Sequence, residues 1–140
     1  MKLSTRGRYG ARIMLELALN YGKGPVPLKH ISSSQEISLK YIGQLMIPLK
    51  IAGLVKTIRG YHGGYYLGRS PDKIELNQII RALEGSLNIV ECINDPDICP
   101  RHPKCITRDI WVKINTIIVK YLDSITLEDM VLRYNKKVEI

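Results

Sequence analysis

Hydrophobic residues recur every three or four positions through the first fifty residues of the chain, and this period predicts helices. Ser4 is a suitable cap for a first helix that runs to about Tyr21. A short helix over 27–35 follows, and Ser38 caps a third helix. The inward stripe of that third helix is predicted at four apolar positions: Ile42, Leu45, Leu49 and Ala52.

The second and third of these helices have the spacing of a helix-turn-helix, in which the later helix enters the DNA major groove. Polar residues lie on the other side of its first turns: Ser38, Lys40, Tyr41 and Gln44. A Gln side chain can pair with an adenine edge, and Lys suits phosphate or guanine. Gly43 and Pro48 both weaken a helix, so we expect this one to bend or break near residue 47.

After Gly53 the apolar period shortens to two, which predicts strands. Two such segments flank the glycine-rich turn RGYHGG and predict a hairpin. A hairpin directly after a recognition helix is a wing. Arg59 at its base is placed to enter a narrow minor groove, and His62 is expected at its exposed tip.

The second half of the chain predicts a helix over about 76–85, a long helix from about Thr107 to Leu122, and a short helix from Thr126. The apolar stripe of the long helix is too wide for one neighbour, so we expect it to contact its own head and a second subunit. The ending NKKVEI is expected to be a loose tail. The fold class is thus mainly helical with a small β-hairpin wing: a winged helix-turn-helix over 1–85, a loop over 86–107, and a dimerisation helix with a C-terminal helix over 108–140.

All of the excess positive charge lies in the first half of the chain. Residues 1–70 carry 11 Lys/Arg against 2 Asp/Glu, whereas residues 71–140 carry 10 against 11, so net +9 and −1 give the total of +8. Arg6, Arg8 and Arg12 cluster at the start of the first helix, where an acid would suit the helix dipole better, and a phosphate contact would explain them. A polyanion, double-stranded DNA, is the expected partner. No apolar run is long enough to span a membrane and no signal peptide is evident, so we expect a cytoplasmic protein.

Candidate chemistry lies in one segment, ECINDPDICPRHPKC, which contains all three cysteines of the chain: Cys92, Cys99 and Cys105. An odd number of thiols in a reducing compartment argues against disulfides and favours metal binding or reactive thiol chemistry. The intervals of six and five residues are wider than the CxxC pairs of structural zinc sites and the compact motifs of ferredoxins. Three thiolates leave one coordination position for another ligand.

Long stretches of the chain closely resemble the Rrf2 family of winged-helix regulators, in particular its branch of iron-sulfur cluster regulators (IscR-like proteins). The resemblance rests on MKLSTRGRYGARIMLELAL, on SLKYIGQL, on GLVKTIRGYHGGYYL and on the three-cysteine loop followed by CITRDIW. It covers about 130 of the 140 residues. It implies a homodimer joined by the long helix and a cluster bound by the loop.

The chain departs from that family at the fourth cluster ligand. Members with a [2Fe-2S] cluster commonly place a histidine three residues after the third cysteine, where this chain has Arg108; nitric oxide sensors use an acid near position 8, where it has Arg8. His102 is the nearest replacement, Asp97 and Asp109 are weaker ones, and a small thiol or water is a further option.

These observations predict a DNA-binding transcriptional regulator, mainly a repressor of iron-sulfur assembly or sulfur-metabolism genes, and not an enzyme. Its cofactor is expected to be an iron-sulfur cluster, [2Fe-2S] rather than [4Fe-4S]. A nitric oxide or redox sensor with a [4Fe-4S] cluster is the alternative among regulators. An electron-transfer protein is disfavoured by three rather than four cysteines and by the basic head, and a zinc-stabilised DNA-binding module is a third option.

Overall fold

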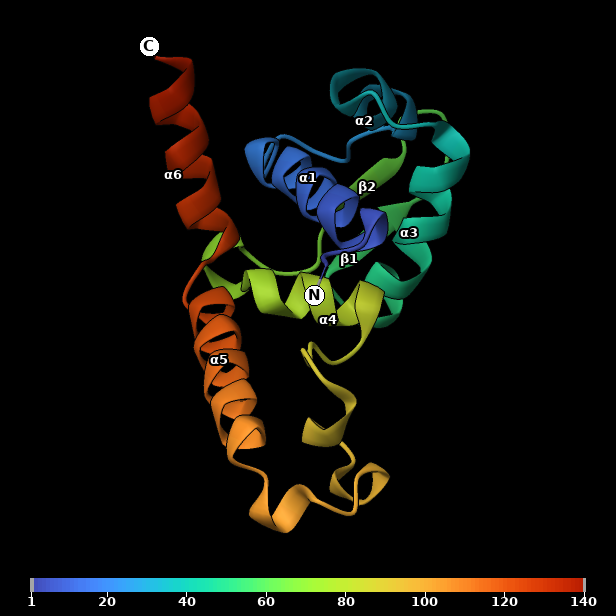
Figure 1. Cartoon of the computed structure of the whole chain (residues 1–140). Helices are drawn as coiled ribbons and strands as arrows, with labels where there is room; N and C mark the ends of the chain where they lie inside the picture. Colours follow the sequence, from blue (N-terminus) through green and yellow to red (C-terminus); the bar gives the residue numbers. More distant parts are fainter. Residues whose placement is uncertain (1, 140) are drawn as a thin grey trace.

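The computed structural model describes residues 2–139. Its elements follow one another in the order α1 (Thr5–Leu19), α2 (Leu28–Gln35), α3 (Leu39–Ile51), β1 (Val55–Ile58), β2 (Gly64–Leu67), α4 (Leu76–Glu84), α5 (Ile106–Asp123) and α6 (Leu127–Val138) (Figure 1). Short 3-10 turns precede α4 and punctuate the loop between α4 and α5: Pro71–Lys73, Glu91–Ile93, Pro96–Ile98 and His102–Lys104. The predicted fold class, mainly helical with a β-hairpin wing, is confirmed.

The N-terminal head is built around apolar side chains that the helical period places on one side of each helix. α1 and α3 supply most of the residues that are almost completely buried: Ile13, Met14, Leu17, Ile42, Leu45, Met46 and Leu49. α1 packs on α4 so closely that a Cβ atom at Gly10 would lie 2.0 Å from Cδ1 of Leu83. The absence of a side chain at Gly10 therefore sets the distance between these two helices.

α3 is one continuous helix from Leu39 to Ile51, so of the bend or break predicted near residue 47 the break is wrong. Pro48 removes one backbone donor, but it lies in the last turn, and Leu49 on the same turn is fully buried. The predicted stripe was wrong at Ala52, which is exposed after the helix ends; Met46 is buried instead. At the other end the Ser38 hydroxyl accepts the backbone N–H of Tyr41 at 3.2 Å, as an N-cap does.

The two strands of the wing pair antiparallel from Val55 opposite Leu67 to Ile58 opposite Gly64. Val26, in the link between α1 and α2, extends this sheet, because its N–H donates to the Tyr65 carbonyl at 2.7 Å and its carbonyl accepts the Tyr65 N–H at 2.8 Å. The hairpin is therefore fixed to the head as far as Tyr65, next to its turn, and the turn projects.

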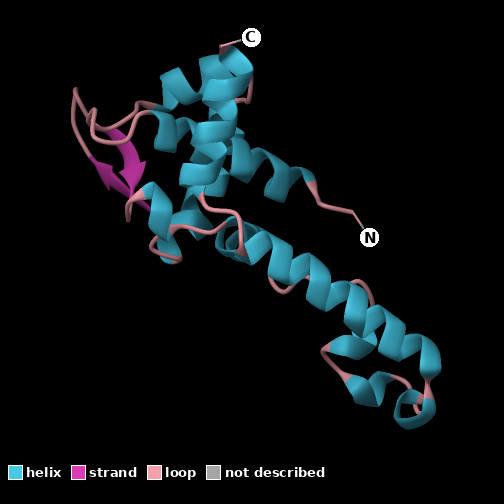
Figure 2. Cartoon of the chain, turned by 90° about the vertical axis from the view of Figure 1, so that its left-hand side faces the viewer, coloured by secondary structure: helices cyan, strands magenta, loops and turns pink. Residues whose placement is uncertain are grey.

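α5 and the loop over 86–105 run beside each other and form an arm that projects from the head, with the cysteine segment at its far end (Figures 1 and 2). Asn115 ties the two together, because its Oδ1 accepts the N–H of Ile89 at 3.0 Å. Figure 2 shows the hairpin on the side of the head remote from the tip of the arm. α5 begins at Ile106, one residue before the predicted start.

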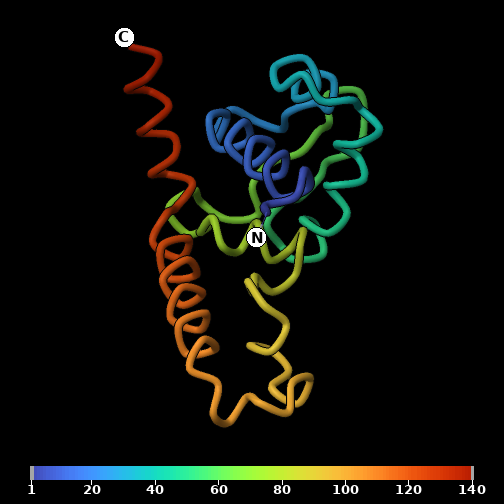
Figure 3. The backbone as a smooth tube through the Cα atoms, viewed as in Figure 1, coloured from blue at the N-terminus to red at the C-terminus, as the bar shows by residue number. Residues whose placement is uncertain are grey.

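After α5 the chain returns to the head. The N–H of Leu127 donates to the Ile74 carbonyl at 2.9 Å, and the Leu127 side chain is fully buried. α6 begins with a capping box, in which the Thr126 hydroxyl accepts the Asp129 N–H at 3.1 Å and the Asp129 carboxylate accepts the Thr126 N–H at 2.9 Å. The loose tail predicted from Asn135 is wrong, because α6 continues to Val138. Figure 3 shows its end far from the cysteine loop.

Candidate DNA-binding surface and cysteine loop

The outward side of α3 presents the polar groups expected of a recognition helix. Lys40 and Gln44 are exposed, one turn apart, on the side opposite the buried Ile42 and Leu45. Ser38 is engaged as the cap of the same helix. The first two turns of α3 therefore offer one cation and one amide to a ligand in front of the helix.

Tyr41 is half-buried and packs against the head. Its ring meets the Tyr9 ring edge-on, with centroids 5.9 Å apart and an interplanar angle of 84°. The Arg12 guanidinium lies 5.3 Å from the centroid of the Tyr9 ring on the same helix. Tyr9 thus fixes the Tyr41 ring against α1, which leaves the tyrosine less free to reach bases than Lys40 or Gln44.

The three arginines at the start of α1 have different surroundings. Arg6 donates from Nε to the Leu83 carbonyl at 3.2 Å, and Arg12 donates to the side chain and the backbone carbonyl of Gln35. Among the residues described, Arg8 hydrogen-bonds only to the Thr5 hydroxyl of its own helix, at 3.3 Å. All three arginines are exposed, but two of them hold α1 to its neighbours, whereas Arg8 is bonded to no other element.

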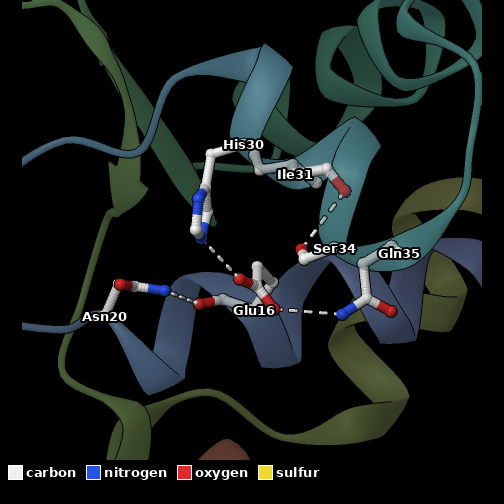
Figure 4. Close-up of polar contacts among 6 residues, drawn as sticks. All are labelled: Glu16, Asn20, His30, Ile31, Ser34 and Gln35. Atoms are coloured by element: carbon white, nitrogen blue, oxygen red, sulfur yellow. Dashed lines mark hydrogen bonds and ion pairs between the residues drawn. The ribbon is translucent and has the colours of Figure 1, made fainter.

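A buried carboxylate joins α1 to α2, and the sequence reasoning missed it (Figure 4). Glu16, only 8% exposed, accepts the Gln35 amide at 3.0 Å and pairs with Nε2 of His30 at 3.0 Å. The signal was present, because Glu16 is the first of only two acids among residues 1–70 and lies on the apolar side of a helix. This cluster fixes the first helix of the helix-turn-helix on the head.

A second acid occupies the N-terminus of α1 although α1 contains none in its first turn. The Glu84 carboxylate accepts the backbone N–H of Ser4 at 2.7 Å, that of Gly7 at 3.3 Å, and the Ser4 hydroxyl. A Cβ atom at Gly7 would lie 2.7 Å from Oε1 of Glu84. The positive end of the α1 dipole is therefore neutralised by Glu84, the last residue of α4, and not by an acid of α1 itself.

The tip of the wing is open to solvent. Arg59 and His62 are both exposed, and the His62 ring lies edge-on to Tyr61 with centroids 4.8 Å apart. Tyr61 is 97% exposed. Both wing residues selected from the sequence are therefore exposed; Arg59, expected at the base of the wing, lies instead in its turn, directly after β1 ends at Ile58.

The cysteine loop does not hold a preassembled metal site. Cys92, Cys99 and Cys105 are free and half-buried, and among residues 2–139 no three His, Cys, Asp or Glu side chains converge as metal ligands would. Cys99 and Cys105 line one groove at the tip of the arm, to which Cys92 does not contribute. The Cys92 end is attached to α5 instead, because Nε of Arg108 donates to the Cys92 carbonyl at 3.3 Å.

Two features of the loop bear on ligand chemistry. Nδ1 of His102 lies 3.2 Å from the Cys99 carbonyl, so the backbone orients the ring through one nitrogen. The Thr107 hydroxyl, and after it the backbone N–H of Arg108, lower the pKa of the Cys105 thiol from its usual value. The ionised form of Cys105, the form that binds metals, is therefore favoured by its place at the start of α5.

A helix-turn-helix followed by a hairpin, on a head that carries all the excess positive charge of the chain, defines a winged-helix DNA-binding regulator. The chain belongs to the Rrf2 family, described as iron-dependent transcriptional regulators, whose sequence profile matches residues 3–133.

Individual relatives agree with this assignment. The regulator CymR of Bacillus subtilis (strain 168) is 46% identical over 130 residues, which cover 93% of this chain and 89% of that protein. The regulator IscR of Aliivibrio salmonicida (strain LFI1238) is 40% identical over 130 residues, 93% of this chain and 77% of that protein. The relatives are named as transcriptional regulators and not as enzymes, and this chain is accordingly a transcriptional regulator.

Solved structures extend the likeness to the fold. The structure of CymR, titled the global cysteine regulator of B. subtilis, has a TM-score of 0.82 at 44% identity and covers 95% of this chain and 98% of that one. IscR of T. potens has a TM-score of 0.80 at 41% identity and covers 100% and 92%. Within the described part of the chain, no helix combines the length and apolarity needed to cross a bilayer.

Proposed function

We propose that this protein is a homodimeric, cytoplasmic repressor that binds a palindromic DNA operator and senses iron-sulfur cluster status through the loop that contains Cys92, Cys99 and Cys105. The observation that carries the proposal is the presence of three free thiols on one exposed loop at the tip of the arm, on a chain of this regulator family. Genes of iron-sulfur assembly or sulfur metabolism are the proposed targets.

The donor set of the loop fits an iron-sulfur cluster, which cysteine thiolates hold. None of the loop residues is buried, so little packing opposes a rearrangement that gathers the three thiols. Metal binding commonly orders a polar segment of this kind. When bound, the cluster would supply a group whose redox state and ligation respond to iron, oxygen or nitric oxide. A [2Fe-2S] cluster is proposed ahead of [4Fe-4S].

His102 is proposed as the fourth ligand. Histidines that bind metals usually donate the other ring N–H to a carbonyl, and the Cys99 carbonyl is in place for that role at Nδ1. Nε2 then remains for iron. Arg108, three residues after the last cysteine, cannot ligate and instead holds the Cys92 carbonyl. Asp97 and Asp109 are the proposed alternatives.

The DNA contacts are proposed to divide between bases and backbone. Gln44 would read an adenine edge, and Lys40 and Arg8 would contact phosphates, because all three are exposed on the first turns of their helices. Arg59 and His62 of the wing would contact the adjacent groove. Ser38 and Tyr41 would support the recognition helix, with Tyr41 at the margin of the base contacts.

The dimer is proposed to form through the arm. α5 exposes a broad apolar face to solvent: Ile106, Ile110, Trp111, Ile114, Ile117 and Tyr121. An exposed apolar patch of this extent usually marks an association surface. Two copies paired along α5 would place two recognition helices for the two half-sites of a palindrome.

Anaerobic purification of the full chain tests the cluster proposal. We expect brown protein with iron and acid-labile sulfide, and loss of both in Cys92→Ala, Cys99→Ala and Cys105→Ala. Mössbauer spectra distinguish [2Fe-2S] from [4Fe-4S] clusters. Colourless protein that contains zinc, or no metal at all, would overturn the proposal. Metal-free protein would indicate a regulator that works without a cluster. Two observations favour this alternative: the three thiols do not converge on one point, and the fold is similar to that of CymR, a cysteine regulator.

The fourth ligand needs its own variants. We expect His102→Ala to lower the oxygen stability of the cluster and to change its spectrum, whereas the matched control His62→Ala, on the wing, leaves both unchanged. The double variant His102→Ala with Arg108→His returns an imidazole to the position usual in the family and should restore the spectrum in part. Unchanged spectra in His102→Ala would reject His102.

A further inference from the structure

The outward face of α3 changes character along its length. Four residues recur at steps of four, three and four on the side opposite the buried stripe: Lys40, Gln44, Ile47 and Ile51. The first two are polar, as expected of a DNA-reading surface. The last two are isoleucines that are 60% and 83% exposed.

The isoleucines make no contribution to the core that would explain them. The neighbouring Leu45, Met46 and Leu49 fill the inward side of the same two turns at 0–1% exposure, so Ile47 and Ile51 point away from it. They continue the face that begins with Lys40 and Gln44, in the half of the chain with net charge +9. A DNA duplex is the ligand that this charge selects, and an apolar side chain there needs an apolar group on DNA.

Thymine carries an apolar group, its 5-methyl group, on the edge that faces the major groove. In this groove the bases are distinguished by hydrogen-bond donors and acceptors and by that one projecting apolar group, which apolar side chains contact. We propose that Ile47 packs against a thymine methyl group beside the adenine that Gln44 reads, and so selects thymine at that position of each half-site. This inference rests on the proposed placement of α3 in the major groove.

Gly43 supports the approach that this contact requires. It lies one turn before Ile47 on the exposed surface of α3, and a Cβ atom at this position would meet no other atom within 4 Å. A glycine here lets the helix backbone come close to the base edges, which brings a branched side chain one turn later within van der Waals reach of a methyl group. Ile51 ends the helix, about 6 Å further along its axis, and recognition helices contact bases mainly near their N-termini.

The test begins with selection of bound sequences from a random duplex DNA library by the full-length dimer. We expect an adenine in each half-site that Gln44→Ala no longer selects, next to a thymine that Ile47→Ala no longer selects. Ile51→Ala is the matched control, since it removes the same side chain from the same face, and it should keep the thymine.

The second arm replaces the selected thymine by deoxyuridine in one half-site, which removes a single methyl group. For the wild-type protein the dissociation constant should rise about fourfold, the equivalent of one buried methyl group. For Ile47→Ala the two duplexes should bind equally, and for Ile51→Ala the fourfold difference should remain.

The outcomes separate the two proposals. If Gln44→Ala selects the same sequence as the wild type, the placement of α3 fails and the inference fails with it. If the adenine depends on Gln44 but deoxyuridine weakens wild type and Ile47→Ala equally, only the thymine contact is refuted. If Ile47→Ala changes the oligomeric state and not the selected sequence, the isoleucine face is a protein interface and the inference is overturned.

Discussion

The head and the arm of this chain contain apolar residues in similar proportion but use them differently. Every buried hydrophobic side chain of the described residues lies at 13–83 or at Ile125 and Leu127, and residues 84–124 contain none. The head therefore has a core of its own. The arm, which carries the cysteine loop, has no such core and exposes the apolar face of α5.

The difference can be seen in two helices that border each other. In α4 the apolar residues Ile79 and Leu83 are buried in the core of the head. In α5, Trp111 is 38% and Ile117 57% exposed. Burial of the first set stabilises the fold of one chain, and burial of the second would stabilise only an assembly. In a regulator built in this way, the head can stay folded while the arm changes, as the proposed sensing by the cysteine loop requires.

The largest expected effect comes from a charge on the apolar face of the arm. Ile114→Asp would bury an unpaired carboxylate in the proposed dimer, at a cost of at least about 3 kcal/mol, or roughly 100-fold in the dimer dissociation constant. Sedimentation velocity should show monomers, and operator affinity should fall with the loss of one half-site. Thr116→Asp adds the same charge on the opposite side of α5 and should remain dimeric. A dimeric Ile114→Asp protein would contradict the proposed interface.

The next largest effect is a difference in stability between a substitution in the core and one on the surface of the monomer. In the Ile114→Asp background, Leu127→Ala should lower the free energy of unfolding by about 2–5 kcal/mol, because the side chain is fully buried where α6 joins the head. Ile117→Ala in the same background should change it by less than about 0.5 kcal/mol, as for other exposed positions. Urea unfolding followed by circular dichroism measures both. Equal losses would show that the arm packs on the head in solution.

A pair of glycine substitutions sharpens the comparison further. Gly10→Ala places a methyl group against Leu83, and such overpacking should cost about 1–3 kcal/mol. Gly43→Ala meets open space in the middle of α3 and should stabilise the protein by up to about 1 kcal/mol through helix propensity. Thermal unfolding of the two variants should therefore shift in opposite directions. A stabilised Gly10→Ala would contradict the close packing of α1 on α4.

The elements of the fold were predictable wherever the apolar period was regular. The helix-turn-helix, the wing and the long helix follow from local patterns, and so does the capping box of α6. The two errors have different causes. α3 continues through Pro48 because its inward side is held by the core, which single-residue propensities do not show. α6 continues past Asn135 although this segment is exposed; Lys136 and Lys137 in its last turn suit the helix dipole, so packing is not the reason.

The site was predictable to a smaller extent. The three thiols and the polar face of α3 can be recognised in the sequence from the types of residue and the intervals between them. Glu84, which caps α1 from a distance of about eighty residues along the chain, is not, nor is the pairing of Glu16 with His30 and Gln35. Such contacts depend on which helices become neighbours. The fourth cluster ligand stays a prediction for the same reason, because the loop has no core to fix its partners.

The smallest expected effect concerns the joint where the chain leaves the arm and re-enters the head. The backbone N–H of Thr126, and after it the Thr126 hydroxyl, lower the pKa of the Asp129 carboxyl below its usual value. A depressed pKa in the folded state means that the ionised group adds stability above the unfolded pKa of about 3.9, and that this stability is lost as the pH falls through the folded value.

Asp129→Asn removes this titration, so the gap in thermal midpoint between wild type and variant should be constant at neutral pH and should close below about pH 4. Glu128→Gln, a neighbouring exposed acid of the same first turn that takes no part in the capping box, is the control and should follow the wild type through the acid range. The midpoints from pH 7 to pH 3 are measured by circular dichroism. A gap that stays open at pH 3 would mean that the asparagine change acts through packing of α6 on the head and not through the charge of its cap.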